Sequence, residues 1–315
     1  MNKDSAYKIH FAPLQGYTDY VFRNAFDSYF GGPDVYYTPF IRVEKGGLRN
    51  KDLRDILPER NKVSHLVPQI LPGTPEEFRL LADEVRKLGY REIDINLGCP
   101  FPLIAGKRKG AGMLPFPEQV RETMSVMKEY PEVRFSIKMR LGWENVKECL
   151  SLVETLNALP LAYITVHART GKQQYKGFVQ MDAFGDFYRA CKHPLVYNGD
   201  LKSVEDIHRI LTEYPRLEGV SLGRGLLASP FLCKEWKGGA PEHEKERMSL
   251  LAGFHEELFA GYSAYLQGES QLLNRMKSLW LYFLPATDRK LLKQIKKANN
   301  LTRYRESVKA IFTQE

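Results

Sequence analysis

A cysteine stands at the end of a strand-like segment near the middle of the chain. Residues 92–100 read EIDINLGCP, an alternating segment that runs into Asn96, Gly98, Cys99 and Pro100. A single cysteine is more often a small buried apolar residue than a reactive one. Glycine and proline favour a loop, however, so we expect the Cys99 thiol where a strand passes into a loop and where it is free to react.

Three later segments pass from apolar to polar residues in the same way: SIKMRLG (136–142), YITVHART (163–170) and LVYNGD (195–200). Lys138 must either pair with a carboxylate of the core or hold an anionic cofactor, because an unpaired ammonium is rarely buried. His167, taken alone, is typical of a hydrogen-bonded core histidine. Together with Cys99, these residues indicate one active site that several strand ends share.

The elements that must position these residues alternate along the chain. Eight strand-like segments are expected, at 8–15, 35–40, 65–71, 92–98, 134–141, 162–170, 194–200 and 219–225. Helical patterns are expected between most of them, at 18–30, 74–88, 116–129, 145–158, 180–191 and 203–213, with Thr18, Thr74 and Ser203 as their opening residues where a cap is evident. The segment 41–62 has the weakest pattern. Alternating strands and helices predict a parallel (β/α)8 barrel.

The pattern changes after Gly-Gly-Ala-Pro at 238–241, because the remaining sequence is helical and contains no strand-like segment. We therefore predict an α/β protein of two domains. A catalytic (β/α)8 TIM barrel comprises residues 1–240, and a small all-helical domain comprises residues 241–315.

Active sites of such barrels lie at the C-terminal ends of the strands. The polar residues that close the predicted strands should therefore meet; they are Gln15, Gln69, Asn96, Cys99, Lys138, Arg140, His167, Arg169, Asn198, Asp200 and Arg224. The last two strands end in Asn-Gly-Asp (198–200) and Gly-Arg-Gly (223–225). Glycine lets backbone N–H groups approach a phosphate and Arg224 can neutralise it, so we predict a phosphate site there.

Composition excludes several classes of protein. The 315 residues, 43% of them hydrophobic, can form a sizeable core. The chain starts without an apolar signal segment and has no run of about 18 apolar residues, so we expect a cytoplasmic protein with no membrane partner. The four cysteines form no C-x-x-C pair, which argues against disulfides and a zinc site, and we expect no metal.

The net charge of +8 is concentrated near the C-terminus. Residues 275–315 contain ten Lys and Arg against three acidic residues, a balance of +7. In the segment DRKLLKQIKKANN, Leu291, Leu292 and Ile295 can face a core while Lys290, Lys293 and Lys297 form a stripe. Such a stripe suits a phosphate backbone, although an ordinary solvated helix face has the same pattern.

The series of motifs resembles one family. APLQGYTD (12–19), DINLGCP (94–100), KGAG (109–112), IKMRLGW (137–143), VHART (166–170), YNGD (197–200) and LGRG (222–225) are similar, in this order, to motifs of the bacterial flavin-dependent tRNA-dihydrouridine synthases. Gly-Ala-Gly-Met-Leu and Gln-Gly-Tyr depart from the usual residues of two of these motifs. The resemblance implies an enzyme with FMN as cofactor, NADPH as reductant and tRNA as substrate, acting as a monomer.

The resemblance also implies roles for individual residues. The phosphate of FMN would contact Gly199, Asp200, Gly223 and Arg224, its ring and ribityl chain would contact Gln69, Lys138 and His167, and Pro13, Leu14 and Asn198 would complete the cofactor site. The reduced flavin would deliver hydride to C6 of a D-loop uridine, and Cys99 would protonate C5 to give 5,6-dihydrouridine. Asn96, Arg169 and Tyr175 would position the uracil, while Arg275, Lys277, Lys290, Lys293 and Lys297 would hold the tRNA backbone.

Two other classes of function fit parts of the pattern. An FMN barrel oxidoreductase for a small molecule, such as dihydroorotate or an enone, would share the phosphate site and Lys138, but it has no use for a basic tail. A non-catalytic RNA-binding module would keep the barrel as a scaffold. It would not need the polar groups that close so many strands.

Overall fold

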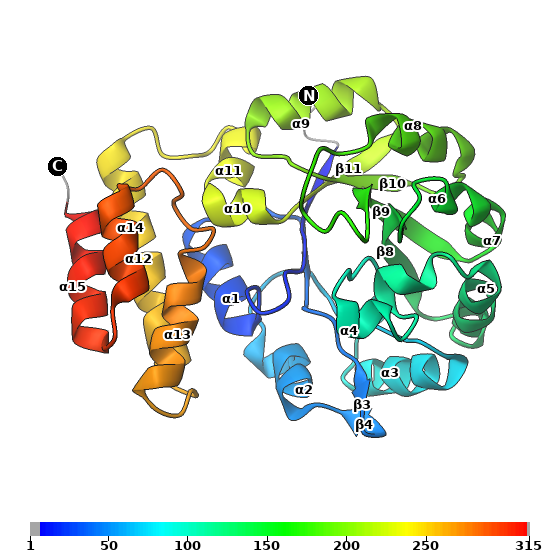
Figure 1. Cartoon of the computed structure of the whole chain (residues 1–315), viewed down its shortest axis with the longest axis horizontal. Coiled ribbons are helices and arrows are strands. Elements are labelled where there is room, and N and C mark those ends of the chain that lie inside the picture. The colour runs from blue at the N-terminus through cyan, green and yellow to red at the C-terminus, as the bar shows by residue number, and fades with distance from the viewer. Residues whose placement is uncertain (1–6, 314–315) are drawn as a thin grey trace.

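The computed structural model describes residues 7–313, and its centre is a closed barrel of parallel strands (Figure 1). The strands are β1 (Lys8–Phe11), β2 (Val35–Tyr37), β5 (Leu66–Val67), β6 (Gln69–Ile70), β7 (Glu92–Leu97), β8 (Arg134–Gly142), β9 (Leu161–Thr170), β10 (Leu195–Asn198) and β11 (Leu217–Leu222). Each coincides with a predicted segment, so the predicted barrel is confirmed.

The third predicted strand is split in two at Pro68. Its first half, β5, pairs with β2, and its second half, β6, pairs with β7. Proline has no N–H to donate to a ladder, which explains the interruption. The carbonyl of Pro68 still accepts a bond of 3.0 Å from the amide of Asp94. The two halves therefore act as one strand that closes the barrel.

Helices surround the barrel. The predicted helical segments contain helices with differences at their ends, whereas the helices at 50–56, 102–105, 224–228 and 232–237 were not predicted, and residues 224–225 were expected in a strand. The helices are α1 (Tyr20–Tyr29), α2 (Asn50–Ile56), α3 (Pro75–Lys87), α4 (Pro102–Ala105), α5 (Pro117–Ser125), α6 (Glu148–Ser151), α7 (Val153–Asn157), α8 (Met181–Ala190), α9 (Val204–Glu213), α10 (Arg224–Ala228) and α11 (Leu232–Lys237). Thr74 and Ser203 cap α3 and α9 as predicted. The helix predicted at 145–158 is two short helices, and the weak segment 41–62 contains a small hairpin of β3 (Val43–Glu44) and β4 (Gly47–Leu48) before α2.

The predicted start of α1 at Thr18 is wrong by one residue. Asp19 is the N-cap, and its carboxylate accepts a bond from the amide of Phe22. The hydroxyl of Thr18 instead accepts a bond of 2.9 Å from the amide of Leu14 and so stabilises the loop before the helix. Both residue types are good caps, and the contact with Leu14 decides between them.

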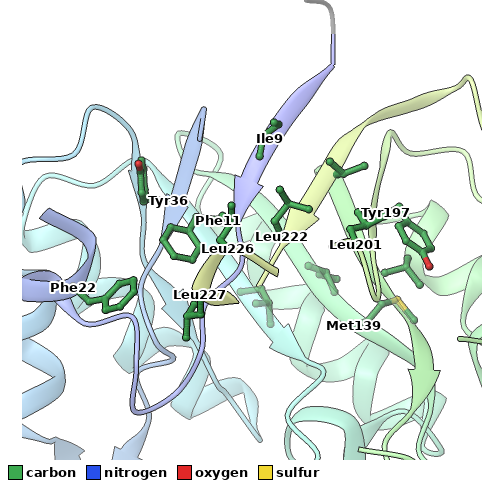
Figure 2. Close-up of a cluster of buried hydrophobic side chains, with 14 of the residues drawn as sticks. Ile9, Phe11, Phe22, Tyr36, Met139, Tyr197, Leu201, Leu222, Leu226 and Leu227 are labelled. Atoms are coloured by element: carbon green, nitrogen blue, oxygen red, sulfur yellow. The ribbon is translucent and has the colours of Figure 1, made fainter. Parts of the chain in front are cut away.

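The first and last strands of the barrel meet in a densely packed seam (Figure 2). Phe11 of β1 and Leu222 of β11 are neighbours in the ladder. Phe22 of α1 and Leu226 of α10 lie beside them, and all four side chains are buried. This packing holds the ends of β1 and β11, and the loops that follow them, in a fixed position.

The described chain after α11 is helical, as predicted, and forms α12 (Glu244–Ser263), α13 (Glu269–Leu279), α14 (Arg289–Lys297) and α15 (Leu301–Phe312). They lie on one side of the barrel, where α12 packs on α1 (Figure 1). Gly253 and Gly261 make this approach possible, because a Cβ atom at either position would lie 2.6 Å from Tyr29 or Val21. The division into domains at residues 240 and 241 stays a prediction.

The hydrophobic pattern of α14 is also found in the structure. Ile295 is buried, whereas Lys290, Lys293 and Lys297 are exposed. All four cysteines have free thiols. Across residues 7–313, no helix combines the length and the apolar character that a membrane span requires.

Candidate active site

The C-terminal ends of the barrel strands open into one cleft of about 950 Å³. Every residue of the barrel that the sequence placed in the site lines this cleft: Pro13, Leu14, Gln69, Asn96, Cys99, Lys138, His167, Arg169, Tyr175, Asn198, Gly199, Asp200, Gly223 and Arg224. Gln15 and Arg140 line it too. The predicted convergence of the strand ends is therefore found, and the chemistry of the cleft depends on how these groups are paired.

Lys138 is a half-buried cation without a carboxylate partner in the described part of the chain. Its ammonium donates a bond of 3.1 Å to Oδ1 of Asn198, whose amide nitrogen donates in turn to the carbonyl of Ser221. Burial, with a smaller contribution from Arg140, lowers the pKa of Lys138 to about 8. An ammonium has three donors, and this one uses only one side-chain acceptor. Of the two alternatives for Lys138, the structure favours the one in which it holds an anion.

His167 lies beside Lys138 as a neutral imidazole. Burial, and after it the charges of Arg140 and Lys138, keeps the pKa of His167 well below its ordinary value. Its Nε2 lies 3.3 Å from Nη1 of Arg169, which can only donate. The lone pair therefore sits on Nε2 and the proton on Nδ1.

Arg169 is used inside the protein. Its side chain is only 2% exposed, and its guanidinium binds both carboxylate oxygens of Asp200 and the carbonyl of Gly177. Burial acts to raise the pKa of Asp200, but the bonds and charge of Arg169, with the charge of Arg224, lower it below its ordinary value. Arg169 thus fixes Asp200 and the loop after β9, which does not favour the expected direct contact with a uracil.

Arg224 is more accessible than Arg169. It donates a bond of 3.3 Å to Oδ1 of Asp200, and its guanidinium carbon lies 4.3 Å from the centre of the Tyr175 ring. Arg140 approaches the same ring at 5.5 Å. Two cations therefore flank one aromatic ring at the edge of the cleft.

A chain of hydrogen bonds runs from the barrel interior to Cys99. Asp94, which is completely buried, accepts bonds from the hydroxyl of Ser136 at 2.6 Å and from Nε2 of Gln69 at 2.7 Å. Oε1 of Gln69 accepts a bond of 2.7 Å from Nδ2 of Asn96, and Oδ1 of Asn96 accepts bonds from the backbone amides of Gly98 and Cys99. Gln69 and Asn96 therefore use their amides to orient the loop that carries the thiol.

Asp94 was missed by the sequence analysis. Burial raises its pKa to about 6. A signal for it existed, because Asp94 and Asn96 are two residues apart in one strand and must point to the same face. Since Asn96 was expected in the site, the period of the strand would have indicated that Asp94 lies behind it.

The Cys99 thiol is half-buried, and Cys99 contacts Gly110 and Ala111 in the same connection between β7 and α5. Burial raises its pKa, so the thiol is protonated at neutral pH. The carbonyl of Cys99 accepts a bond from the amide of Ala111, and Gly110 packs against it with a φ of +57°. A Cβ atom on Gly110 would lie 2.9 Å from Cβ and O of Cys99. Glycine at this position of the KGAG motif therefore lets the loop pack directly beneath the thiol.

Comparison with known proteins places this cleft in a family. The model of the dihydrouridine synthase family, Dus, matches residues 10–315. The chain belongs to the dihydrouridine synthase family. The resemblance seen in the motifs is thereby confirmed, and with it the predicted enzyme class, a flavin-dependent oxidoreductase.

Named relatives agree with the family. The probable tRNA-dihydrouridine synthase of Staphylococcus aureus (strain COL) is 28% identical over 285 residues, which are 86% of this chain and 81% of that protein. Probable tRNA-dihydrouridine synthase 2 of Bacillus subtilis (strain 168) is 29% identical over 262 residues, 80% of this chain and 78% of that protein.

Solved structures share the fold at much lower identity. Morphinone reductase in complex with tetrahydroNAD is 11% identical, with a TM-score of 0.53 over 77% of this chain and 90% of that one. A variant of NCR from Zymomonas mobilis is 13% identical, with a TM-score of 0.52 over 76% of this chain and 88% of that one. These two likenesses support the barrel architecture alone.

Arg275 and Lys277, which the sequence predicted to hold the tRNA backbone, both have hydrogen-bond partners within the protein. The guanidinium of Arg275 donates to the carbonyls of Gly16 and Tyr17, to the carboxylate of Asp19 and to the hydroxyl of Tyr262. The ammonium of Lys277 donates a bond of 2.8 Å to the carbonyl of Ala298. The guanidinium of Arg275 is used within the protein, so the structure does not favour it as a contact for RNA phosphates. The Lys277 ammonium has donors beyond its bond to Ala298, and its contact with RNA stays a prediction.

The helical part of this dihydrouridine synthase also contributes to the cleft, which the sequence analysis missed. Leu281, Tyr282 and Pro285 from the segment between α13 and α14 line it. On another side it is lined by Arg42, Arg49 and Lys51, from the region of the β3–β4 hairpin and α2. Neither group follows from a local pattern, because each depends on how distant segments fold over the strand ends.

Proposed function

We propose that this protein reduces a uridine of tRNA to 5,6-dihydrouridine, with FMN as the bound cofactor and a reduced nicotinamide dinucleotide as the source of electrons. The observation that carries the proposal is a single cleft in which the protonated thiol of Cys99 and the half-buried ammonium of Lys138 both lie. One group can give a proton, and the other can hold a negative charge. Family membership supports the same reaction.

The charge of the cleft fits an anionic cofactor. Among its lining residues eight are basic and one is acidic: Arg42, Arg49, Lys51, Lys138, Arg140, Arg169, Lys202 and Arg224, against Asp200. Cations gathered in one cleft repel each other and attract an anion that neutralises them. We assign the negatively charged parts of FMN to this surface.

The phosphate fits best where the loops after β10 and β11 touch. A Cβ atom on Gly225 would lie 2.2 Å from the carbonyl oxygen of Leu201, so glycine is required for the loops to approach so closely. This contact brings Gly199 and Asp200 next to Gly223 and Arg224. Backbone N–H groups and the Arg224 guanidinium would then bind the phosphate, as the position after the last two strands of such a barrel suggests.

Bound FMN supplies hydride chemistry, and the residues of the chain supply the charge and the proton. Lys138, which lines the cleft, would hold the flavin ring and stabilise negative charge on it. Cys99 would give its proton to C5 of the uracil while C6 accepts hydride; its raised pKa keeps that proton available at neutral pH. Asn96 and Tyr175 would position the uracil, and Arg169 would fix Asp200 at the phosphate site.

The tRNA would extend from the cleft over the helical part of the chain. Pro285 lines the cleft, and α14 begins only four residues later at Arg289, a span of at most about 14 Å. This helix carries five basic residues and no acidic one. We propose Lys290, Lys293 and Lys297 as contacts for the phosphate backbone, which would hold the RNA while the target base is turned out into the cleft.

The experiment is a reduction assay on unmodified tRNA transcripts with purified protein, FMN and NADPH, read by mass spectrometry and by mapping the reduced position. The proposal expects uridine in the tRNA to gain two hydrogens, and expects the same position to lack dihydrouridine in cells without the gene. Dihydroorotate-type acids and enones are tested in parallel. Turnover of one of these, with no reduction of any tRNA, would favour the small-molecule oxidoreductase instead. We further propose that the enzyme is a monomer and works in the cytoplasm, which sedimentation and cell fractionation test.

A further inference from the structure

Exposed apolar side chains gather at the mouth of the cleft. Across the described residues, six large hydrophobic side chains are exposed: Phe101, Leu103, Leu150, Tyr175, Phe178 and Leu281. Four of them, Phe101, Tyr175, Phe178 and Leu281, line the cleft. Exposed apolar groups that cluster in one place mark a binding surface, whereas scattered ones need no explanation.

Phe178 is the most exposed of them, at 87%, and it sits on a loop that is firmly held. Arg140 binds the carbonyl of Gln174 at 2.7 Å, and Arg169 binds the carbonyl of Gly177 at 2.7 Å. The side chain of Gln173 donates a bond of 3.2 Å to the carbonyl of Phe178 itself. These bonds fix the backbone on both sides of the ring, so the ring is presented to solvent by a rigid support.

The other exposed side chains come from separate elements. Phe101 follows Cys99 by two residues and immediately precedes α4, which begins at Pro102. Leu281 belongs to the segment after α13. The thiol thus lies near an apolar rim made by the loop after β7, the loop after β9 and the helical part of the chain.

The charge of the same cleft decides between partners. Some of its cations pair with carboxylates, but Lys51, Lys138, Arg140 and Lys202 line the cleft and form no salt bridge within residues 7–313, so the surface attracts a polyanion. A polyanion that also offers flat apolar faces is a nucleic acid strand with unstacked bases. A membrane offers no flat rings, and a second copy of this basic chain would be repelled.

We propose that the Phe178 ring, with Phe101 on the other loop, stacks on the bases that flank the target uridine and so replaces the stacking lost when that uridine is turned into the cleft. This inference rests on the proposed function, since it requires an RNA substrate. The proposal means that the enzyme recognises the bases on either side of the target uridine as well as the uridine itself. Because stacking accepts any base, it fixes the position of the strand without fixing its sequence.

The test replaces Phe178 with Ala and, separately, with Trp. Stacking of one base on an aromatic ring corresponds to a factor of about 5 to 150 in affinity. Phe178→Ala should therefore lower kcat/KM for tRNA by a factor in this range, and Phe178→Trp should restore it. Flavin content and NADPH oxidation without RNA should stay unchanged in both variants. Leu150→Ala is the matched control, because Leu150 is exposed on α6 and does not line the cleft.

A second arm removes the flanking bases instead of the ring. An RNA with abasic residues on both sides of the uridine should be reduced more slowly by the unaltered enzyme, and Phe178→Ala should cause no further loss on that RNA. Additive losses would overturn the stacking contact. So would equal kcat/KM of Phe178→Ala and unaltered enzyme on intact tRNA, or a change in sedimentation that makes the rim a contact between copies. If the unaltered enzyme reduces no tRNA, it is the proposed function that fails.

Discussion

Replacing Lys138 with Met should make the flavin-free protein more stable while it weakens flavin binding. The ammonium of Lys138 is half-buried, and within residues 7–313 its partner is an amide oxygen and not a carboxylate. Methionine has a similar length and no charge, so it removes the cost of burying the ammonium. The charge of Lys138 therefore serves flavin binding and lowers the stability of the flavin-free protein.

The magnitude follows from the lowered pKa. A fall from 10.5 to about 8 corresponds to about 3 kcal/mol of preference for the neutral form in the folded protein. Loss of the hydrogen bond to Asn198 lowers the free energy of unfolding by about 1 kcal/mol and offsets part of this gain. We therefore expect Lys138→Met to raise the free energy of unfolding by about 2 kcal/mol at pH 7. Flavin binding should weaken by about 10- to 150-fold, the value of one charge-assisted contact.

The pH dependence has a definite sign. Between pH 8 and 10.5 the unfolded chain keeps the Lys138 proton while the folded protein releases it, so the stability of the unaltered protein rises with pH in this window. The advantage of Lys138→Met should therefore be full below pH 8 and should be lost before pH 10.5, because the gain of the unaltered protein across this window exceeds the advantage.

The assay is urea unfolding of flavin-free protein at several pH values, with flavin affinity measured separately by fluorescence. Lys109→Met is the control, because Lys109 is largely buried but forms a salt bridge with Glu77. Its loss leaves a carboxylate unpaired and should destabilise the protein. If Lys138→Met is also less stable than the unaltered protein at pH 7, then interactions within the protein fully compensate the burial of the ammonium, and the reasoning from burial is wrong.

Three further results are expected. Cys99→Ala should retain FMN and NADPH oxidation but reduce tRNA about 10²- to 10⁴-fold more slowly; an unchanged rate in a single-turnover assay would mean that the proton comes from another group. Arg224→Ala should lose about 10- to 150-fold in FMN affinity, since Arg169 is already bound to Asp200 and cannot replace it; full retention of FMN on dialysis would refute the phosphate site. Lys293→Glu with Lys297→Glu should flatten the log–log salt dependence of tRNA binding by about one to two. Reversal of the exposed Lys128 and Lys192, which lie on the barrel, should leave that slope unchanged, and equal slopes in both pairs would make α14 an ordinary solvated surface.

Much of the architecture was present in local patterns. Short apolar segments that alternate with amphipathic helices predict a barrel because strand and helix periods differ, and each period appears within a few residues. The same patterns placed Cys99, Lys138, His167 and Asp200 at strand ends, where the closed sheet must bring them together. Caps such as Thr74 and Ser203 were equally local, and both were found where expected.

Only the tertiary structure showed which charged side chains form salt bridges with each other. Arg169 and Asp200 are 31 residues apart, and Arg275 and Asp19 are 256 apart, yet each pair forms a salt bridge. A basic residue looks the same in a sequence whether its donors are free for a ligand or already used inside the protein. Burial, which sets the pKa of Lys138 and of Cys99, is likewise a property of all the neighbours at once. Periodicity can therefore tell which face of an element a side chain occupies, but its partner and its charge depend on long-range packing that no local pattern contains.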